Sequence, residues 1–95
     1  MFIIFLKFSD NKSQASQYMQ EHKNWLQKGF DDQVFLVSGS LQPNQGGGII
    51  THNTSLAELE SRVSEDPFVT HNIVTAQIIE ITAAKADQRL EFLIE

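Results

Sequence analysis

Residues Phe2–Lys28 read FIIFLKF-SDNKS-QASQYMQEHKNWLQK, and this stretch decides how the fold begins. The segment Phe2–Phe8 is mostly β-branched or aromatic and stops at a polar cluster, which predicts a strand. From Gln14 to Lys28 the larger apolar residues recur at the spacing of one helical face, which predicts a helix. Ser13 is the candidate cap of this helix, and Gly29 is its candidate end.

The next segment predicts a hairpin. Val34-Phe35-Leu36-Val37 is typical of a second strand, and Ser38-Gly39-Ser40 follows it. Residues 41–48 contain a proline, an asparagine and three consecutive glycines, so they are expected to form a long, pliable tip. A third strand is expected over residues 48–51.

A second helix and a last strand complete the chain. Ser55-Leu56-Ala57-Glu58 matches a capping box, and Leu56, Leu59 and Val63 form an apolar stripe. Asp66-Pro67 is expected to end or interrupt this helix, and Asn72 is expected at the corner before the longest strand, residues 73–82. The order strand, helix, strand, strand, helix, strand predicts a ferredoxin-like α+β fold, in which two helices cover one face of a four-stranded antiparallel sheet.

Both faces of this sheet are expected to require burial. The first strand shows no alternation of apolar and polar residues, and the two helices can cover only one face. Because large exposed apolar patches are rare on monomers, we expect a second subunit to cover the other face and form a homodimer. Residues 1–95 are interpreted as one domain, with a core over about residues 1–82 and a C-terminal extension, residues 83–95, whose apolar residues are expected to pack on something.

Composition excludes several classes of protein. The chain has 95 residues, of which 41% are hydrophobic and 20% charged, as expected for a folded domain. Its net charge of −5 disfavours nucleic acid and anionic membranes as partners. The chain contains no cysteine, which excludes a thiolate nucleophile and fits the cytoplasm. The apolar run Phe2–Leu6 is too short for a transmembrane segment and lacks the flanks of a signal peptide.

His22 is the leading candidate for chemistry. It lies three or four residues from Tyr18, Met19, Trp25 and Leu26, so the helical period places it on the face that points at the sheet. A buried imidazole beside a carboxylate makes a proton carrier, whereas a core histidine that only satisfies a backbone group has a structural role. The period alone does not separate these interpretations.

Asp66 is the candidate carboxylate. It follows the second helix where the chain turns back towards the sheet. The simpler interpretation is that Asp66 caps a short turn with Pro67 at its first position. Trp25 and Phe68 are candidates to line a pocket near His22, although large aromatic residues at such positions are more often part of the core.

These motifs together resemble the YCII-related family of the dimeric α+β barrel group. The resemblance rests on four motifs over about residues 1–82: His22-Lys23-Asn24-Trp25-Leu26, Ser38-Gly39, Gly46-Gly47-Gly48 and Asp66-Pro67-Phe68. It implies a ferredoxin-like fold, a homodimer joined through sheet faces, and an active site built on His22 and Asp66. The candidates for ligand binding beside this pair are Ser38, Gly39, Trp25 and Phe68. Met19 stands where many family members have an arginine, and Ser40 where they often have a proline. The sequence therefore offers no support for an acidic substrate that needs that arginine.

The remaining polar motifs are weaker candidates. His52 is interpreted as a solvated loop residue. His71 could join His22 and Asp66 around a divalent ion, but its spacing does not require a metal, and none is expected. The three glycines do not connect a strand to a helix and are therefore no phosphate-binding loop.

Two functions remain open from the sequence. The first is a cofactor-free enzyme in which His22 and Asp66 perform acid–base chemistry on a small organic molecule, an isomerase or a dehalogenating lyase as the resemblance implies. The second is a non-catalytic module that binds a small ligand or a protein. A heme- or quinone-dependent oxygenase would need an axial ligand or an aromatic constellation that the sequence does not offer.

Overall fold

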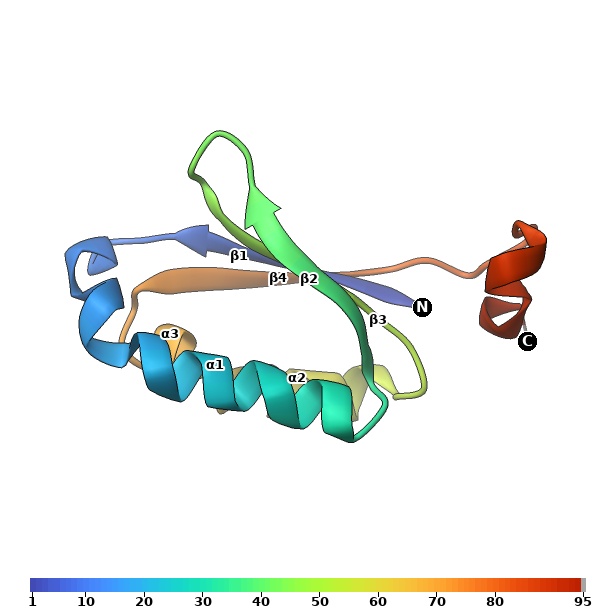
Figure 1. Ribbon diagram of the computed structural model, residues 1–95, viewed down its shortest axis with the longest axis horizontal. Coiled ribbons are helices and arrows are strands. Elements are labelled where there is room, and N and C mark those ends of the chain that lie inside the picture. The colour runs from blue at the N-terminus through green and yellow to red at the C-terminus, as the bar shows by residue number, and fades with distance from the viewer. Residues whose placement is uncertain (95) are drawn as a thin grey trace.

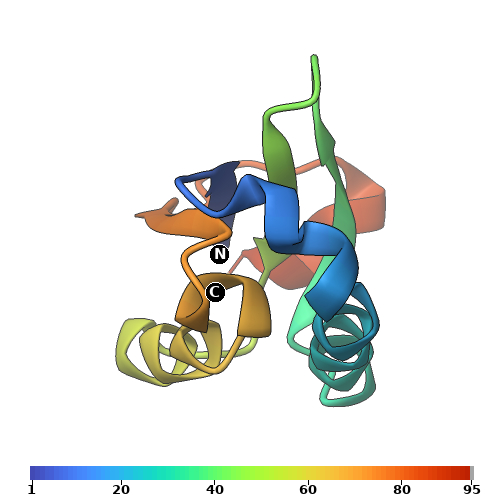
Figure 2. The same ribbon diagram turned by 90° about the vertical axis from the view of Figure 1, so that its left-hand side faces the viewer.

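In residues 1–94, which the computed structural model describes, four strands form an antiparallel sheet in the order β2-β3-β1-β4. Figures 1 and 2 show α1, α2 and α3 on one face of this sheet, with the tip of the β2–β3 hairpin projecting away from them. This arrangement confirms the predicted ferredoxin-like α+β fold. The elements are β1 (Phe2–Phe8), η1 (Lys12–Gln14), α1 (Ala15–Asp31), β2 (Phe35–Leu41), β3 (Gly46–Thr51), α2 (Leu56–Ser64), α3 (Pro67–Thr70), β4 (Val74–Glu80) and η2 (Gln88–Leu93).

The core lies between the sheet and the three helices. In β1, alternate residues point at the helices and are buried, whereas their neighbours are partly accessible. Because burial of apolar surface is the main stabilising term, these contacts hold the helices on this face. The buried apolar residues are Phe2, Ile4, Leu6, Trp25, Val34, Phe35, Ile49, Leu59, Val63, Phe68, Ile73 and Val74.

Helix α1 is longer than predicted and begins and ends differently. Ser13 lies in η1 and does not cap α1, whose N-terminus has no side-chain cap. Gly29 does not end the helix, which continues to Asp31. A Cβ at Gly29 would lie 2.2 Å from ring carbons of Phe35, so glycine is needed there for close packing between the helix and β2.

The end of α1 is a Schellman motif centred on Gln33. Gln33 takes the left-handed conformation (φ 62°) that was expected of a glycine. Its N–H donates to the carbonyl of Phe30, and the N–H of Val34 donates to the carbonyl of Gly29. These two hydrogen bonds satisfy carbonyl groups that the helix end leaves without partners.

The three consecutive glycines belong to a strand, which corrects the prediction that they form the hairpin tip. Gly46, Gly47 and Gly48 pair with β1 on one side and with β2 on the other. A Cβ at Gly46, where φ is +125°, would lie 1.9 Å from the carbonyl oxygen of Leu6, so only glycine fits. The tip is therefore restricted to residues 42–45, and β2 extends to Leu41.

Helix α2 forms as its capping box predicts. The Ser55 side chain accepts a hydrogen bond from the Glu58 N–H, and Leu59 and Val63 are buried. Leu56 is 42% exposed and does not belong to the apolar stripe, which corrects its predicted place.

The last strand is shorter than predicted. Asn72 has the expected left-handed conformation (φ 56°). Strand β4 spans seven residues, Val74–Glu80, and is no longer than β1 or β2. Just beyond β4, the Ile81 N–H donates to the Met1 carbonyl and the Met1 amino group donates to the Ile81 carbonyl, both at 2.9 Å, and the chain then leaves the sheet.

The face of the sheet opposite the helices carries a row of apolar side chains, as the lack of alternation predicted. Ile3 pairs with Ile50 on one side and with Ile79 on the other, and Val37 pairs with Ile50. The row therefore crosses all four strands. Val37 and Ile79 are exposed, and Figure 1 shows no α-helix on this face.

The C-terminal extension leaves β4 and forms the short helix η2 away from the helical layer (Figure 1). Phe92 contacts the His52 ring edge to face, with 5.3 Å between ring centroids. Leu36 and Val37 line a groove together with this extension. Leu90, Phe92 and Ile94 nevertheless stay largely exposed, so the extension packs only partly within one copy of the chain.

Candidate functional site

His22 lies near the middle of α1 and points into the protein, as the helical period predicts. Its side chain is only 12% exposed. The imidazole stacks on the Phe68 ring, with 4.0 Å between centroids and 3° between ring planes. This contact fixes the plane of the imidazole and leaves its edges available for hydrogen bonds.

Asp66 lies at the junction of α2 and α3, where it is completely buried. It is the N-cap of α3, and Pro67 occupies the first position of that helix. Asp66 Oδ1 accepts a hydrogen bond from the Phe68 backbone N–H at 3.0 Å. The capping interpretation of Asp66 is therefore correct, but capping is not the only contact that this carboxylate makes.

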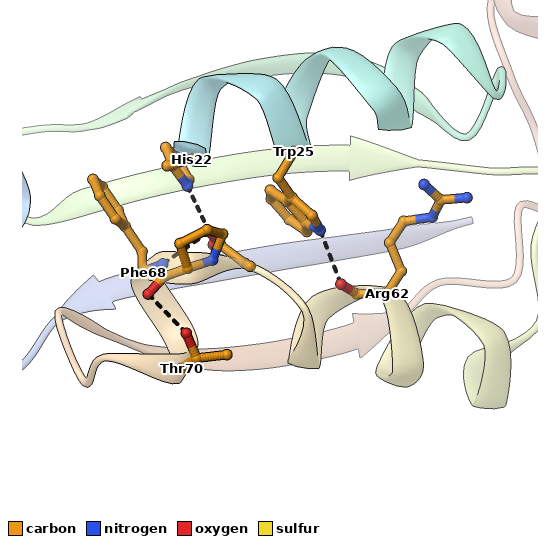
Figure 3. A network of polar contacts seen from close by, with 7 residues as sticks. His22, Trp25, Arg62, Phe68 and Thr70 are labelled. Carbon is orange, nitrogen blue, oxygen red and sulfur yellow. Dashed lines mark hydrogen bonds and ion pairs between the residues drawn. The ribbon is translucent and has the colours of Figure 1, made fainter. Parts of the chain in front are cut away.

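The structure brings His22 and Asp66 together. His22 Nδ1 lies 2.7 Å from Asp66 Oδ1, the same oxygen that caps α3. Figure 3 shows His22 reaching from α1 towards the start of α3, beside the Phe68 ring. A short contact between an imidazole nitrogen and a carboxylate oxygen is a strong, charge-assisted hydrogen bond.

This contact assigns the protons of the imidazole. A carboxylate only accepts hydrogen bonds, so Nδ1 carries the hydrogen and donates it to Asp66. In neutral His22, Nε2 then keeps its lone pair. Within residues 1–94, Nε2 makes no hydrogen bond, and the only buried side-chain nitrogen or oxygen without a partner is Asp66 Oδ2. Nε2 is therefore accessible from outside the protein.

A cavity of about 290 Å³ lies beside His22, between α1 and the glycine-containing parts of β2 and β3. Its wall contains His22, Phe68, Ser38 and Gly39, four of the residues that the sequence selected. Asp66 lies behind His22 and does not line the cavity. The other lining residues are Leu6, Phe8, Met19, Lys23, Leu26, Ser40, Gly46, Gly47, Gly48, Ile49 and Val74.

Trp25 does not line this cavity, which corrects its predicted place. It is buried in the core, and its ring meets Phe35 edge to face at 5.3 Å between centroids. Its Nε1–H donates to the backbone carbonyl of Arg62 at 2.9 Å (Figure 3). Trp25 thus ties α1 to α2 instead of facing a ligand.

Sequence reasoning missed Lys23 and Ser40 as cavity residues. Lys23 lies four residues after Met19 and three before Leu26, so the helical period that selected His22 could have found it. Ser40 lies on the same side of β2 as Ser38, at the strand period of two. The direction of the two serine side chains could not be predicted from the strand period, because the predicted strand ended at Val37.

The other histidines are not part of this site. His71 stacks on Tyr18, with 3.9 Å between ring centroids, and His52 contacts Phe92. In the described residues, no group of three or more His, Asp or Glu side chains is placed to hold a metal ion.

The fold and the site define a ferredoxin-like α+β domain with a histidine–carboxylate pair beside a cleft. The chain belongs to the YCII-related domain family, whose model matches residues 1–82. The extension that begins at residue 83 lies outside this match. No curated protein matched the chain.

A solved structure shares the fold. It is 5-chloro-2-hydroxyhydroquinone dehydrochlorinase from Burkholderia phenoliruptrix in complex with 2,5-dihydroxybenzoquinone. The TM-score is 0.69 at 15% sequence identity, and the match covers 85% of this chain and 93% of that chain. At this identity the similarity supports the fold alone.

Among the helices of residues 1–94, none has the length and apolar character that crossing a bilayer requires.

Proposed function

We propose that this chain is a small-molecule enzyme in which His22 performs acid–base chemistry without a cofactor, with Asp66 as its partner. The observation that carries the proposal is the 2.7 Å contact between His22 Nδ1 and Asp66 Oδ1 at the wall of a cavity, with Nε2 accessible. This is the arrangement that a general base requires, because one nitrogen is oriented by a carboxylate and the other is available to the substrate.

The proposed step begins with a substrate in the cavity. His22 Nε2 takes a proton from a C–H or O–H group of the substrate, and the electrons of that bond form a new π bond. In an elimination, a leaving group such as chloride departs with its bonding electron pair. In an isomerisation, the imidazolium returns the proton to another atom of the substrate. Either outcome fits the isomerase or dehalogenating-lyase activity that the family resemblance implies.

Asp66 has two tasks in this mechanism. It holds the imidazole in the orientation and tautomer that leave Nε2 as the base. It also stabilises the positive charge that His22 acquires when it takes the proton. Asp66 Oδ2 is buried and has no hydrogen-bond partner, so the negative charge of the carboxylate is poorly solvated. The positive charge of an imidazolium at His22 would partly compensate for this lost solvation.

The proposed substrate is a small ring compound, by analogy with the similar solved structure. That protein is a dehydrochlorinase, and it was solved with a dihydroxybenzoquinone. The stacked ring of Phe68 and the apolar residues Phe8 and Leu26 give this cavity walls that suit a small ring. Ser38 and Gly39, in β2, would contact the ligand from the side of the sheet.

The test uses variants of the pair and a panel of halogenated ring acids, chlorinated hydroxy-aromatics and lactones. We expect turnover, followed by chloride release or by proton exchange in D₂O, to fall about 10²-fold or more in His22→Gln. Asp66→Asn should also lose turnover, because the amide cannot balance the imidazolium. His71→Gln is the matched control, since His71 lies outside the cavity, and it should keep full activity.

The alternative is a binding module without catalysis. If His22→Gln retained turnover, or if ligands bound in the cavity and none reacted, the module would be favoured over the enzyme.

We also propose that a second copy of the chain covers the apolar row of Ile3, Val37, Ile50 and Ile79, and that the dimer works in the cytoplasm. Burial of this row would stabilise the dimer by about 25 cal/mol for each Å² of apolar surface removed from water. A Val37→Glu variant should then sediment as a monomer, because an unpaired carboxylate would be buried at the interface. A wild-type chain that sediments as a monomer at all concentrations would contradict the dimer.

A further inference from the structure

The charge of the cavity is opposite to the charge of the chain. The chain has 12 acidic residues against seven lysines and arginines. Among residues 1–94, those that line the cavity nevertheless include no carboxylate, and His22 and Lys23 are the only ionisable ones. Low-dielectric walls around a charge of one sign strengthen its field and attract ligands of the opposite sign.

Within the described part of the chain, no ion pair neutralises the charge of Lys23. The ion pairs in residues 1–94 are His22–Asp66, Arg62–Asp32 and Arg89–Asp87, and Lys23 takes part in none of them. The residues three and four positions away on α1 are Met19, Gln20, Leu26 and Gln27, none of which is acidic. Lys28 provides the contrast, since Asp31 and Asp32 lie three and four positions after it.

The opposite wall supplies neutral donors. Ser38 pairs with Ile49 and Ser40 with Gly47, so both serine side chains are on the helix-facing side of β2. Both residues are exposed and line the cavity. Hydroxyl groups can donate to a ligand oxygen, and the ammonium group of Lys23 can only donate.

The floor of the cavity leaves room for a ring. Gly47 lies on the cavity side of β3, where a Cβ would meet only the Gly39 carbonyl oxygen, at 3.5 Å. The space is therefore open because no side chain fills it. Phe68 and Phe8 supply apolar ring surface at the side of this space.

We propose that Lys23 is the specificity-determining residue of this cavity and that it selects a small ring compound bearing an anionic oxygen, a carboxylate or an ionised ring hydroxyl. Lys23 binds the anionic oxygen, Ser38 and Ser40 donate to it from the sheet, and the ring lies against Phe68 with its reacting atom towards His22 Nε2. This assignment rests on the proposed function for the role of His22, but the binding of the anion requires only Lys23 and the serines.

The experiment compares two probes of nearly equal shape, benzoate and benzamide, by following backbone amide shifts in NMR titrations at low salt. Wild-type protein should bind benzoate about five- to tenfold more tightly than benzamide, the effect of one charge pair close to water. The shifts should be concentrated at residues 38–40 and 46–48, which line the cavity. The preference should weaken as salt is added.

Variants separate Lys23 from the general charge of the chain. Lys23→Gln should abolish the preference for benzoate, and Lys23→Arg should restore it. Lys28→Gln removes the same charge from the same helix outside the cavity and should leave the preference intact. Because Lys23 is exposed, its replacement does not disturb the core.

Three results would overturn the assignment: no binding of benzoate, equal binding of the two probes, or equal loss in Lys23→Gln and Lys28→Gln. Failure of the catalytic proposal gives a different pattern: either the wild type turns over no substrate or His22→Gln keeps its turnover, and in both cases the preference for benzoate remains. If His22→Gln loses turnover but keeps the preference, both proposals are supported.

Discussion

Replacing Asp66 by alanine should remove two hydrogen bonds at once, because a single oxygen of this side chain accepts from His22 Nδ1 at 2.7 Å and from the Phe68 N–H at 3.0 Å. Loss of the N-cap of α3 should cost about 1 kcal/mol. The largely buried imidazole N–H left without a partner should cost about 1–3 kcal/mol more. Removal of the buried carboxylate, whose Oδ2 has no partner, offsets part of this loss. We expect Asp66→Ala to lower the free energy of unfolding by about 2–3 kcal/mol.

Asp66→Asn is the matched variant. Asparagine caps a helix about as well as aspartate, and its amide oxygen can accept from both donors. We therefore expect a loss of less than about 1 kcal/mol, although the charge that stabilises the imidazolium has gone.

The assay is urea unfolding followed by circular dichroism. For a slope of about 1–3 kcal/mol per molar urea, Asp66→Ala should lower the midpoint by about 0.7–3 M, and Asp66→Asn by much less. In the same samples, ¹⁵N NMR of the His22 ring should show a protonated Nδ1 in wild type and in Asp66→Asn, and exchange between tautomers in Asp66→Ala.

Two results would refute this reasoning. If Asp66→Ala cost less than about 1 kcal/mol, the two hydrogen bonds would not hold α1 and α3 together. If Asp66→Asn were as damaging as Asp66→Ala, the charge rather than the accepting oxygen would stabilise the folded state.

Three further predictions concern packing and capping. Gly29→Ala gains about 1 kcal/mol of helix propensity, but it forces a Cβ to 2.2 Å from the Phe35 ring, and such overpacking costs about 1–3 kcal/mol. Urea unfolding should therefore show a net loss of stability. A gain in stability would mean that Phe35 can move aside. Trp25→Phe removes the hydrogen bond to the Arg62 carbonyl at 2.9 Å and should cost about 1–2 kcal/mol in thermal unfolding; an unchanged midpoint would show that this bond adds nothing. Ser55→Ala removes the N-cap of α2 and should cost about 1 kcal/mol, whereas Ser55→Asp should retain stability.

Local patterns predicted the features that depend on neighbouring residues. The helical period placed His22 on the inner face of α1, and the capping box placed the start of α2. The lack of alternation in β1 predicted that the sheet would have apolar side chains on both faces. These predictions hold because side-chain direction follows from the period of the element, which is a property of consecutive residues.

Contacts between distant segments account for the predictions that were wrong. Gly29 was predicted to end a helix, but it is needed for the close packing of Phe35. Gly46 was predicted to lie in a turn, but it is needed for the close approach of the Leu6 carbonyl. Trp25 lies one turn from His22 on the same helix but meets α2 instead of the cavity. In each case a partner from another element decides the role of the residue, and the sequence does not show which distant residues come into contact.

The sequence by itself determined the order of the elements, the amphipathic helix and the two candidate residues His22 and Asp66. The family resemblance implied that the two residues act together, but only the tertiary structure shows that they are in contact, because they are 44 residues apart and meet through the packing of α1 against α3. It also decided which nitrogen of His22 is accessible and that Lys23 and two serines share its cavity. Those relations arise from side chains that converge from different elements, and periodicity within one element cannot encode them.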